Sequence, residues 1–136
     1  MFTEDEAIGI LRDYRHIYMN DLQVILGYIQ LNEQEKAVQY IRKISLAMDE
    51  ESKLYRVKDN SMKCVLIKGY TKARENFIEM IIEIADEDNV LFAQSDCIYI
   101  ERELDKSIRQ AVSDGSGRLN MKLGYDGGAF LERLNG

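Results

Sequence analysis

Apolar side chains recur every three or four residues through the N-terminal part of the chain, which is the spacing of an amphipathic helix. Thr3 and Glu6 form a capping-box pair ahead of this pattern, so we predict a helix from about Thr3 to about Leu31. The apolar stripe of the predicted helix consists of Ile8, Leu11, Tyr18, Leu22, Ile25, Leu26 and Ile29.

A second amphipathic stretch follows a short turn predicted at Asn32-Glu33-Gln34. Its apolar side carries Ala37, Val38, Tyr40, Ile41, Ile44, Ala47 and Met48. A connection this short makes the two helices antiparallel neighbours. Two wide apolar faces cannot bury each other within one hairpin, so they either cover the rest of the chain or pair with a second copy. We favour a homodimer in which two hairpins form a four-helix bundle. Its contacts are expected to be led by Leu22, Ile25 and Ile29 on the first helix and by Ile41 and Ile44 on the second.

The second half of the chain mixes helical and strand-like patterns. Residues 61–74 predict a helix, and residues 77–84, which are rich in β-branched side chains, predict a strand. Ser95 or Asp96 is expected to cap a further helix, and alternating apolar residues predict a strand over 119–125. Turns are expected at residues 86–89, 113–117 and 126–128.

These elements predict an α+β fold with two parts: a helical hairpin domain over residues 1–58 and a small α/β domain over residues 59–136. The net charge of −6 and the absence of a basic run argue against nucleic-acid binding. No apolar stretch is long enough to cross a bilayer, and the acidic N-terminus is unlike a signal peptide, so we expect a cytoplasmic protein without a membrane anchor. Two isolated cysteines and a single histidine give no zinc-site spacing, so we expect no metal site and no cofactor of its own.

His16 is the only histidine of the chain, and it lies at the flank of the apolar stripe. Residues four apart share a helix face, so a polar strip of Arg12, His16, Asn20 and Gln23 should be open to solvent or to a partner. An exposed imidazole is substantially neutral near neutral pH and can act as a nucleophile. The alternative is a surface histidine without a role.

The stretch Arg15-His16 through Asn20-Asp21-Leu22-Gln23-Val24-Ile25 resembles the sporulation phosphorelay phosphotransferase B family. It also resembles the helical hairpin of citrate/fumarate-type sensor histidine kinases. Glu51-Ser52-Lys53-Leu54 and the segment from Gly124 to Phe130 extend the resemblance over most of the chain. It implies a dimeric four-helix bundle followed by a degenerate relic of a kinase ATP-binding domain.

The resemblance further implies that His16 is a phosphoacceptor, which takes a phosphoryl group from an aspartyl phosphate of one response regulator and passes it to another regulator's aspartate. No ATP is needed, because an acyl phosphate is already a reactive donor. Arg15 and Asn20 are expected to assist at the phosphoryl group, with Mg²⁺ supplied by the receiver domain of the regulator. Arg12 and Gln23 are expected to contact that partner. The alternative for each of these four is a solvated surface side chain.

Three departures from working kinases bear on activity. Ile17 occupies the position after the histidine, where such kinases carry an acidic residue. Arg102 and Lys106 stand where kinases place two asparagines that handle magnesium and phosphate, and neither can ligate a cation. Gly115-Ser116-Gly117 is too weak a pattern for a phosphate loop and predicts a connector, and the segment after Phe130 is expected to be too short for the rest of an ATP lid.

Two other functions remain open. The chain is alternatively a catalytic fragment of a citrate/fumarate-type sensor histidine kinase, which binding of ATP and autophosphorylation would single out. It is alternatively a non-enzymatic dimerisation module that binds a response regulator without relaying phosphate.

Overall fold

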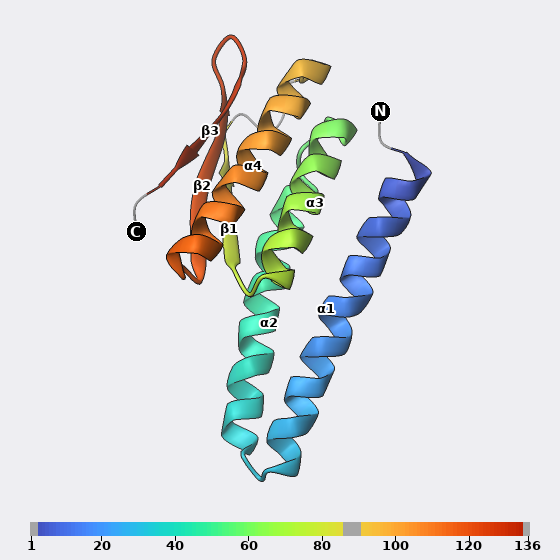
Figure 1. Cartoon of the computed structure of the whole chain (residues 1–136), viewed down its shortest axis with the longest axis vertical. Coiled ribbons are helices and arrows are strands. Elements are labelled where there is room, and N and C mark those ends of the chain that lie inside the picture. The colour runs from blue at the N-terminus through green and yellow to red at the C-terminus, as the bar shows by residue number, and fades with distance from the viewer. Residues whose placement is uncertain (1–2, 86–90, 135–136) are drawn as a thin grey trace.

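The computed structural model describes residues 3–85 and 91–134. Within them, four helices and three strands form an α+β fold (Figure 1). Their order is α1 (Glu4–Gln30), α2 (Gln34–Leu54), α3 (Asn60–Glu75), β1 (Glu79–Ile84), α4 (Gln94–Asp114), β2 (Arg118–Tyr125) and β3 (Ala129–Arg133). α1 and α2 form a long antiparallel hairpin whose turn extends well beyond the α/β part, and α3 lies between α1 and α4.

The hairpin forms where its local signals predicted it. Thr3 caps α1 by accepting a hydrogen bond from the backbone N–H of Glu6 at 3.1 Å, which confirms the predicted start. At the other end Asn32 adopts a positive φ of 58°, a conformation that asparagine tolerates better than most residues, and the chain reverses there into α2.

The sheet has the order β1-β2-β3, with β1 and β2 parallel and β2 and β3 antiparallel. The helix α4 connects the two parallel strands. The antiparallel pair turns through Gly127, whose φ is 67°, and Phe130 of β3 lies over Gly124 so closely that any side chain at 124 would collide with its ring. The sequence pattern did not predict β3, because a five-residue strand of mixed polarity gives no clear alternation.

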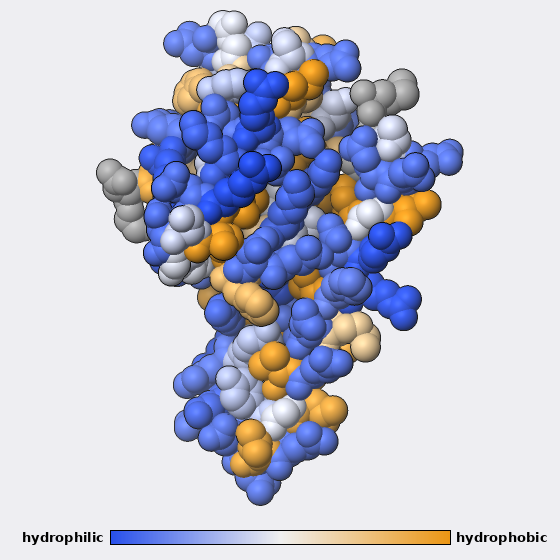
Figure 2. All heavy atoms as spheres, in the orientation of Figure 1, coloured by the Kyte–Doolittle hydropathy of each residue, from blue (hydrophilic) through white to orange (hydrophobic). Residues whose placement is uncertain are grey.

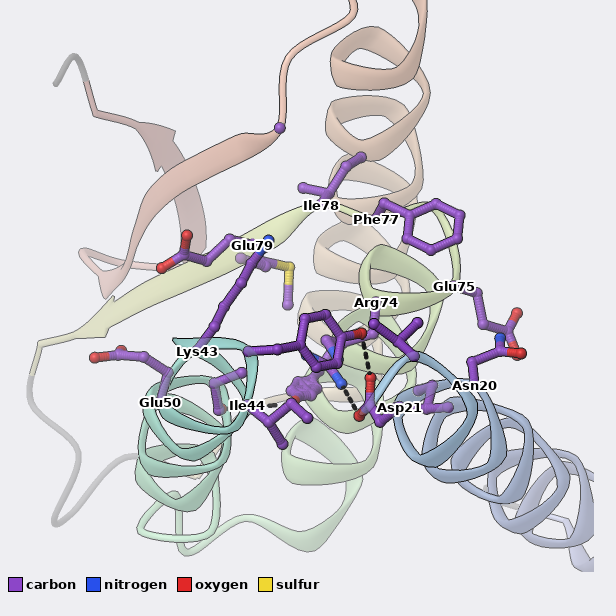
Figure 3. Close-up of a pocket in the computed structure, with 17 residues that line it drawn as sticks. Asn20, Asp21, Lys43, Ile44, Glu50, Arg74, Glu75, Phe77, Ile78 and Glu79 are labelled. Carbon is purple, nitrogen blue, oxygen red and sulfur yellow. Dashed lines mark hydrogen bonds and ion pairs between the residues drawn. The ribbon is translucent and has the colours of Figure 1, made fainter. Parts of the chain in front are cut away.

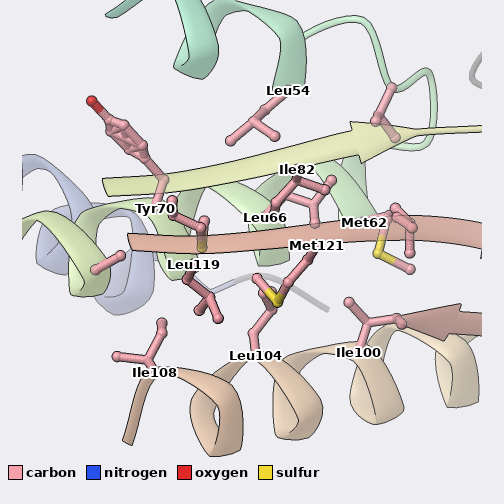
Figure 4. Close-up of a cluster of buried hydrophobic side chains, with 14 of the residues drawn as sticks. Leu54, Met62, Leu66, Tyr70, Ile82, Ile100, Leu104, Ile108, Leu119 and Met121 are labelled. Carbon is pink, nitrogen blue, oxygen red and sulfur yellow. The ribbon is translucent and has the colours of Figure 1, made fainter. Parts of the chain in front are cut away.

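The hydrophobic core lies between the sheet and the helices α3 and α4, and the C-terminal end of α2 joins it (Figure 4). Its fully or nearly fully buried members include Leu54, Met62, Leu66, Ile78, Ile100, Leu104, Leu119, Met121 and Leu123. Leu54 belongs to the hairpin and contacts the α/β part, so the chain on either side of residue 58 contributes to one core.

Two element boundaries differ from the predictions. The predicted strand over 77–84 begins only at Glu79, because Phe77 takes a positive φ of 58° in the turn after α3 and exposes 84% of its surface. Helix α4 is capped at Ala93 rather than at Ser95 or Asp96. Asp96 instead sits in the first turn, where its carboxylate accepts from the N–H of Ala93 at 3.0 Å. The turn predicted at residues 86–89 lies outside the described residues.

The apolar stripe of α1 is not the face that the single chain buries. The buried residues of this helix are Ile17 and Asp21, while most of the stripe is exposed, including Leu11 at 68% and Leu22 at 62%. Apolar side chains are consequently exposed along the hairpin, below the α/β part in the orientation of Figure 2. The physical reason is that α2 and α3 contact α1 from one side and leave the stripe without a partner in this chain.

Candidate functional site

The predicted polar strip is an open face of α1. Arg12, His16, Asn20 and Gln23 are all exposed, and so is Arg15. The buried neighbour Ile17, with 6% of its surface exposed, fixes the rotation of the helix and thereby turns the imidazole of His16 outward. The structure therefore places these residues where the helical spacing predicted them.

A buried ion pair holds the α/β part against the hairpin one turn beyond His16. Asp21 of α1 accepts from the guanidinium of Arg74 of α3 at 2.6 Å and from the hydroxyl of Tyr40 of α2 at 2.8 Å. Only 10% of the Asp21 side chain and 17% of the Arg74 side chain are exposed. Burial, followed by the hydrogen bond to Asp21, raises the pKa of Tyr40 to about 12. Three helices therefore meet at one carboxylate.

A cavity of about 140 Å³ opens beside this ion pair, between the hairpin, α3 and the start of β1 (Figure 3). Its walls are mostly apolar, with Ile44 and Ile78 among them, and the ion pair closes part of its floor. Asn20 and Glu75 line its edge on the side of α1. The polar strip and the cavity thus share Asn20.

Two carboxyl groups stand next to His16. Asp13 lies three residues before it on α1, and Glu75 reaches α1 from the last turn of α3. The Asp13 carboxyl group lies close enough to Glu75 to influence its charge. Burial, and then the contact with Asp13, raises the pKa of Glu75, while the positive charge of a protonated His16 acts in the opposite direction.

Sequence reasoning missed Asp21, Arg74 and Glu75. One signal was available for Asp21, which follows Ile17 by four residues and so lies on the inward face of α1. An aspartate on an inward face requires a partner. Nothing local identifies Arg74 or Glu75, because their contacts to α1 form only when α3 packs there.

The α/β part presents a basic patch on α4. Arg102 and Lys106 are exposed on α4, and with Arg109 they line a shallow depression. Gly115 ends α4 with a φ of 68° and leads directly into β2, so the glycine pair at 115–117 is a connector, as predicted.

Over residues 3–85 and 91–134, no three or more histidine, cysteine, aspartate or glutamate side chains are grouped as a metal site. In the same part of the chain, no helix combines the length and the apolar character that crossing a membrane requires.

Replacing Asp21 with alanine should destabilise the fold by about 3 kcal/mol, because it leaves the mostly buried Arg74 guanidinium without its counter-charge. Asp21→Asn should cost less, since the amide still accepts from Tyr40. Urea unfolding measures both. Asp114→Ala, at an exposed helix end, is the matched control and should change the free energy of unfolding by less than about 0.5 kcal/mol. Equal stability of the Asp21→Ala variant and this control would show that the ion pair contributes nothing.

Comparison with known proteins identifies the hairpin. Residues 3–57 match the family model described as the sensor kinase SpoOB-type alpha-helical domain. A probable C4-dicarboxylate sensor kinase of Halalkalibacterium halodurans is 32% identical over 78 residues, which is 56% of this chain and 15% of that relative. The chain therefore spans only a small part of the relative's length. The match covers both long helices and the polar strip with His16, so the α1–α2 hairpin of this chain is similar to the SpoOB-type alpha-helical domain of sensor kinases.

Proposed function

We propose that this chain is a phosphorelay histidine phosphotransferase, which relays a phosphoryl group between the aspartates of response regulators through His16 and does not use ATP. The observation that carries the proposal is the exposure of the chain's single histidine on a SpoOB-type hairpin. The partners are receiver domains of response regulators, and the reaction takes place in the cytoplasm.

The chemistry requires little beyond positioning. The lone pair of one imidazole nitrogen forms the N–P bond, the P–O bond to the regulator's aspartate breaks, and its electron pair stays on that carboxylate. Asn20, one turn from His16, donates a hydrogen bond to the phosphoryl oxygens, and Arg15 offsets their charge. Arg12 and Gln23 extend the same face toward the docked regulator, which supplies Mg²⁺ from its own acidic pocket.

The open apolar stripes support a homodimer. Leu22 and Ile29 of α1 and Ile41 of α2 are exposed in the single chain, whereas Ile25 and Ile44 are half-buried within the hairpin. Exposed apolar residues of both helices recur at heptad-like spacing, as at Leu22 and Ile29 or at Ile41, Met48 and Tyr55. A second hairpin packed on these stripes forms a four-helix bundle and removes this apolar surface from water. His16 lies off the stripe and stays accessible in such a bundle.

One observation favours a sensor-kinase fragment as the second candidate. The relative with 32% identity is a probable sensor kinase, and the match of 78 residues is longer than the segment 3–57 of the hairpin model. In that case the α/β part is a nucleotide-binding kinase domain. We favour a degenerate ATPase-like domain instead, because Arg102 and Lys106 offer no oxygen ligand for magnesium. The third possibility, a dimerising module that binds a regulator without phosphotransfer, predicts that His16 is never labelled.

Replacing His16 with alanine should abolish acid-labile, base-stable labelling by a phosphorylated receiver domain. Because the side chain is exposed, the free energy of unfolding should change by no more than about 0.5 kcal/mol. Gln39→Ala, an exposed polar residue on α2, is the control and should accept phosphate like the wild type. Labelling of the His16→Ala variant would rule out His16 as the acceptor.

Introducing a charge on the stripe should dissociate the dimer. Leu22→Glu would bury a carboxylate in the bundle, yet it leaves the side chain in water in the single chain, so the monomer should stay folded. Leu46→Glu is the matched control, because Leu46 is equally exposed, at 63%, but lies off the stripe of α2. Sedimentation at protein concentrations of tens of micromolar, roughly where such interfaces persist, should show a dimer for the wild type and for the control. A folded wild-type monomer would contradict the four-helix bundle.

Magnesium-ATP should show no saturable binding at physiological salt. The basic face of α4 attracts anions weakly, and salt screens that attraction. Isothermal calorimetry tests binding, and incubation with labelled ATP alone should leave His16 unmodified. Stoichiometric, magnesium-dependent binding would make the sensor-kinase fragment the better proposal.

A further inference from the structure

The cavity beside the buried ion pair has walls that belong to the packed part of the molecule. Ile17 of α1 and Ile78 and Met80 at the start of β1 line it, with only 6%, 2% and 8% of their surfaces exposed. Ile44, which is half-buried, lines it from α2 (Figure 3). Because core residues hold these walls in place, the cavity is part of the fold and not a gap between mobile side chains.

Two small residues keep this space open. Ala47 of α2 contributes only a methyl group to the wall, and Gly117 lies at the mouth, just before β2. A Cβ atom added at Gly117 would meet no other atom within 4 Å. The cavity volume of about 140 Å³ is close to the ~150 Å³ of an engineered apolar protein cavity that takes up benzene. One aromatic ring therefore matches the size of the cavity.

Phe77 adds an apolar ring to the mouth of the cavity (Figure 3). Its φ of 58° lies in the left-handed region, which is unfavourable for a bulky side chain, and 84% of its surface is exposed. Strained residues of this kind concentrate at ligand sites, where the surrounding structure holds them in place. A molecule in the cavity would remove part of this ring from water, which favours binding of an apolar ligand.

The floor of the cavity carries no unmatched charge. Arg74 is paired there with Asp21 at 2.6 Å, and the hydroxyl of Tyr40 donates to the other oxygen of the same carboxylate at 2.8 Å. A charged ligand would have to leave water for apolar walls and an ion pair that is already formed. The floor therefore favours an uncharged ligand.

The charges at the rim of the cavity point the same way. Glu50, Glu75 and Glu79 line it together with the single ammonium group of Lys43, so an anion would be repelled. Glu50 and Glu79 are each paired with a basic side chain outside the cavity, at 2.8 and 3.3 Å. These two carboxylates therefore have little attraction left for a cation.

We propose that this cavity binds a small, uncharged, mainly apolar molecule about the size of one aromatic ring. The body of the ligand packs between Ile44 and Ile78. A single polar group on the ligand lies at the edge with Asn20 and Glu75, whose side-chain oxygens accept a hydrogen bond. The bound molecule bridges the hairpin and the α/β part, because α1, α2, α3 and β1 all line the cavity. The inference does not depend on the proposed phosphotransfer.

Phenol is the probe, because it is a single ring with one hydroxyl group and is uncharged at neutral pH. In protein with ¹³C-labelled isoleucine methyl groups, bound phenol should shift the signals of Ile44 and Ile78 in a saturable manner through its ring current. The signal of Ile100, which is buried in the core on α4, should not move. Benzoate and benzylammonium carry opposite charges on the same ring, and both should bind at least about tenfold more weakly than phenol.

Ala47→Leu should fill the cavity and lower the affinity for phenol by about 10- to 100-fold, the range that overpacking costs. The variant should stay folded, because leucine is a good helix former and its side chain enters existing space. Gln39→Leu is the matched control, since it adds the same side chain at an exposed position of α2 away from the cavity lining. It should bind phenol like the wild type.

Phe77→Asn tests the ring at the mouth separately. Asparagine tolerates a positive φ better than phenylalanine, so the melting temperature should not fall. The affinity for phenol should decrease by about 2- to 10-fold, the range that one aromatic pair contributes. An unchanged affinity would overturn the part assigned to Phe77.

Three results would overturn the site itself. They are the absence of saturable shifts at Ile44 and Ile78, shifts that persist unchanged in Ala47→Leu, and tighter binding of benzoate or benzylammonium than of phenol. Loss of phenol binding in Ala47→Leu, with binding retained in Gln39→Leu, would support it.

Discussion

The buried contact of Asp21 with Arg74 and Tyr40 is the interaction on which the rest of the arrangement depends. One carboxylate joins α1, α2 and α3 through hydrogen bonds of 2.6 and 2.8 Å. A buried ion pair adds little net stability, because desolvation offsets most of its attraction. Its strict geometry instead selects one rotation of α1 and one placement of α3 among the many that apolar packing alone would allow.

That rotation sets the properties of both outer faces of α1. With Ile17 and Asp21 turned inward, the polar strip around His16 faces solvent on one side and the stripe around Leu22 faces solvent on the other. A phosphoacceptor has to be reached by a partner, and a dimer contact has to be free of other packing. The Asp21 contact therefore leaves both the phosphoacceptor face and the dimer face open, as the proposed function requires. The same contact places α3 where this helix covers neither face.

The sequence predicted those features of the structure that local patterns determine. The Thr3 cap, the hairpin and the outward position of His16 follow from spacing and capping, and the structure confirms them. The β3 strand was not predicted, because its pattern is too short to be distinguished from that of a loop. The positions of Arg74 and Glu75 beside α1 were not predicted for another reason. Both residues lie more than fifty positions along the chain from the α1 residues they approach, and the periodicity of α3 does not show which of its residues will contact another helix.

The role of α3 changes how the division of the chain near residue 58 is to be understood. A degenerate kinase domain that served only as a remnant would have no reason to touch the hairpin beside His16. Here α3 supplies Arg74 to the contact that orients α1. Arg102 and Lys106 are exposed on α4 and take no part in this contact. Under the proposed function, selection on phosphotransfer would retain the α/β part for this packing, whether or not it binds nucleotide.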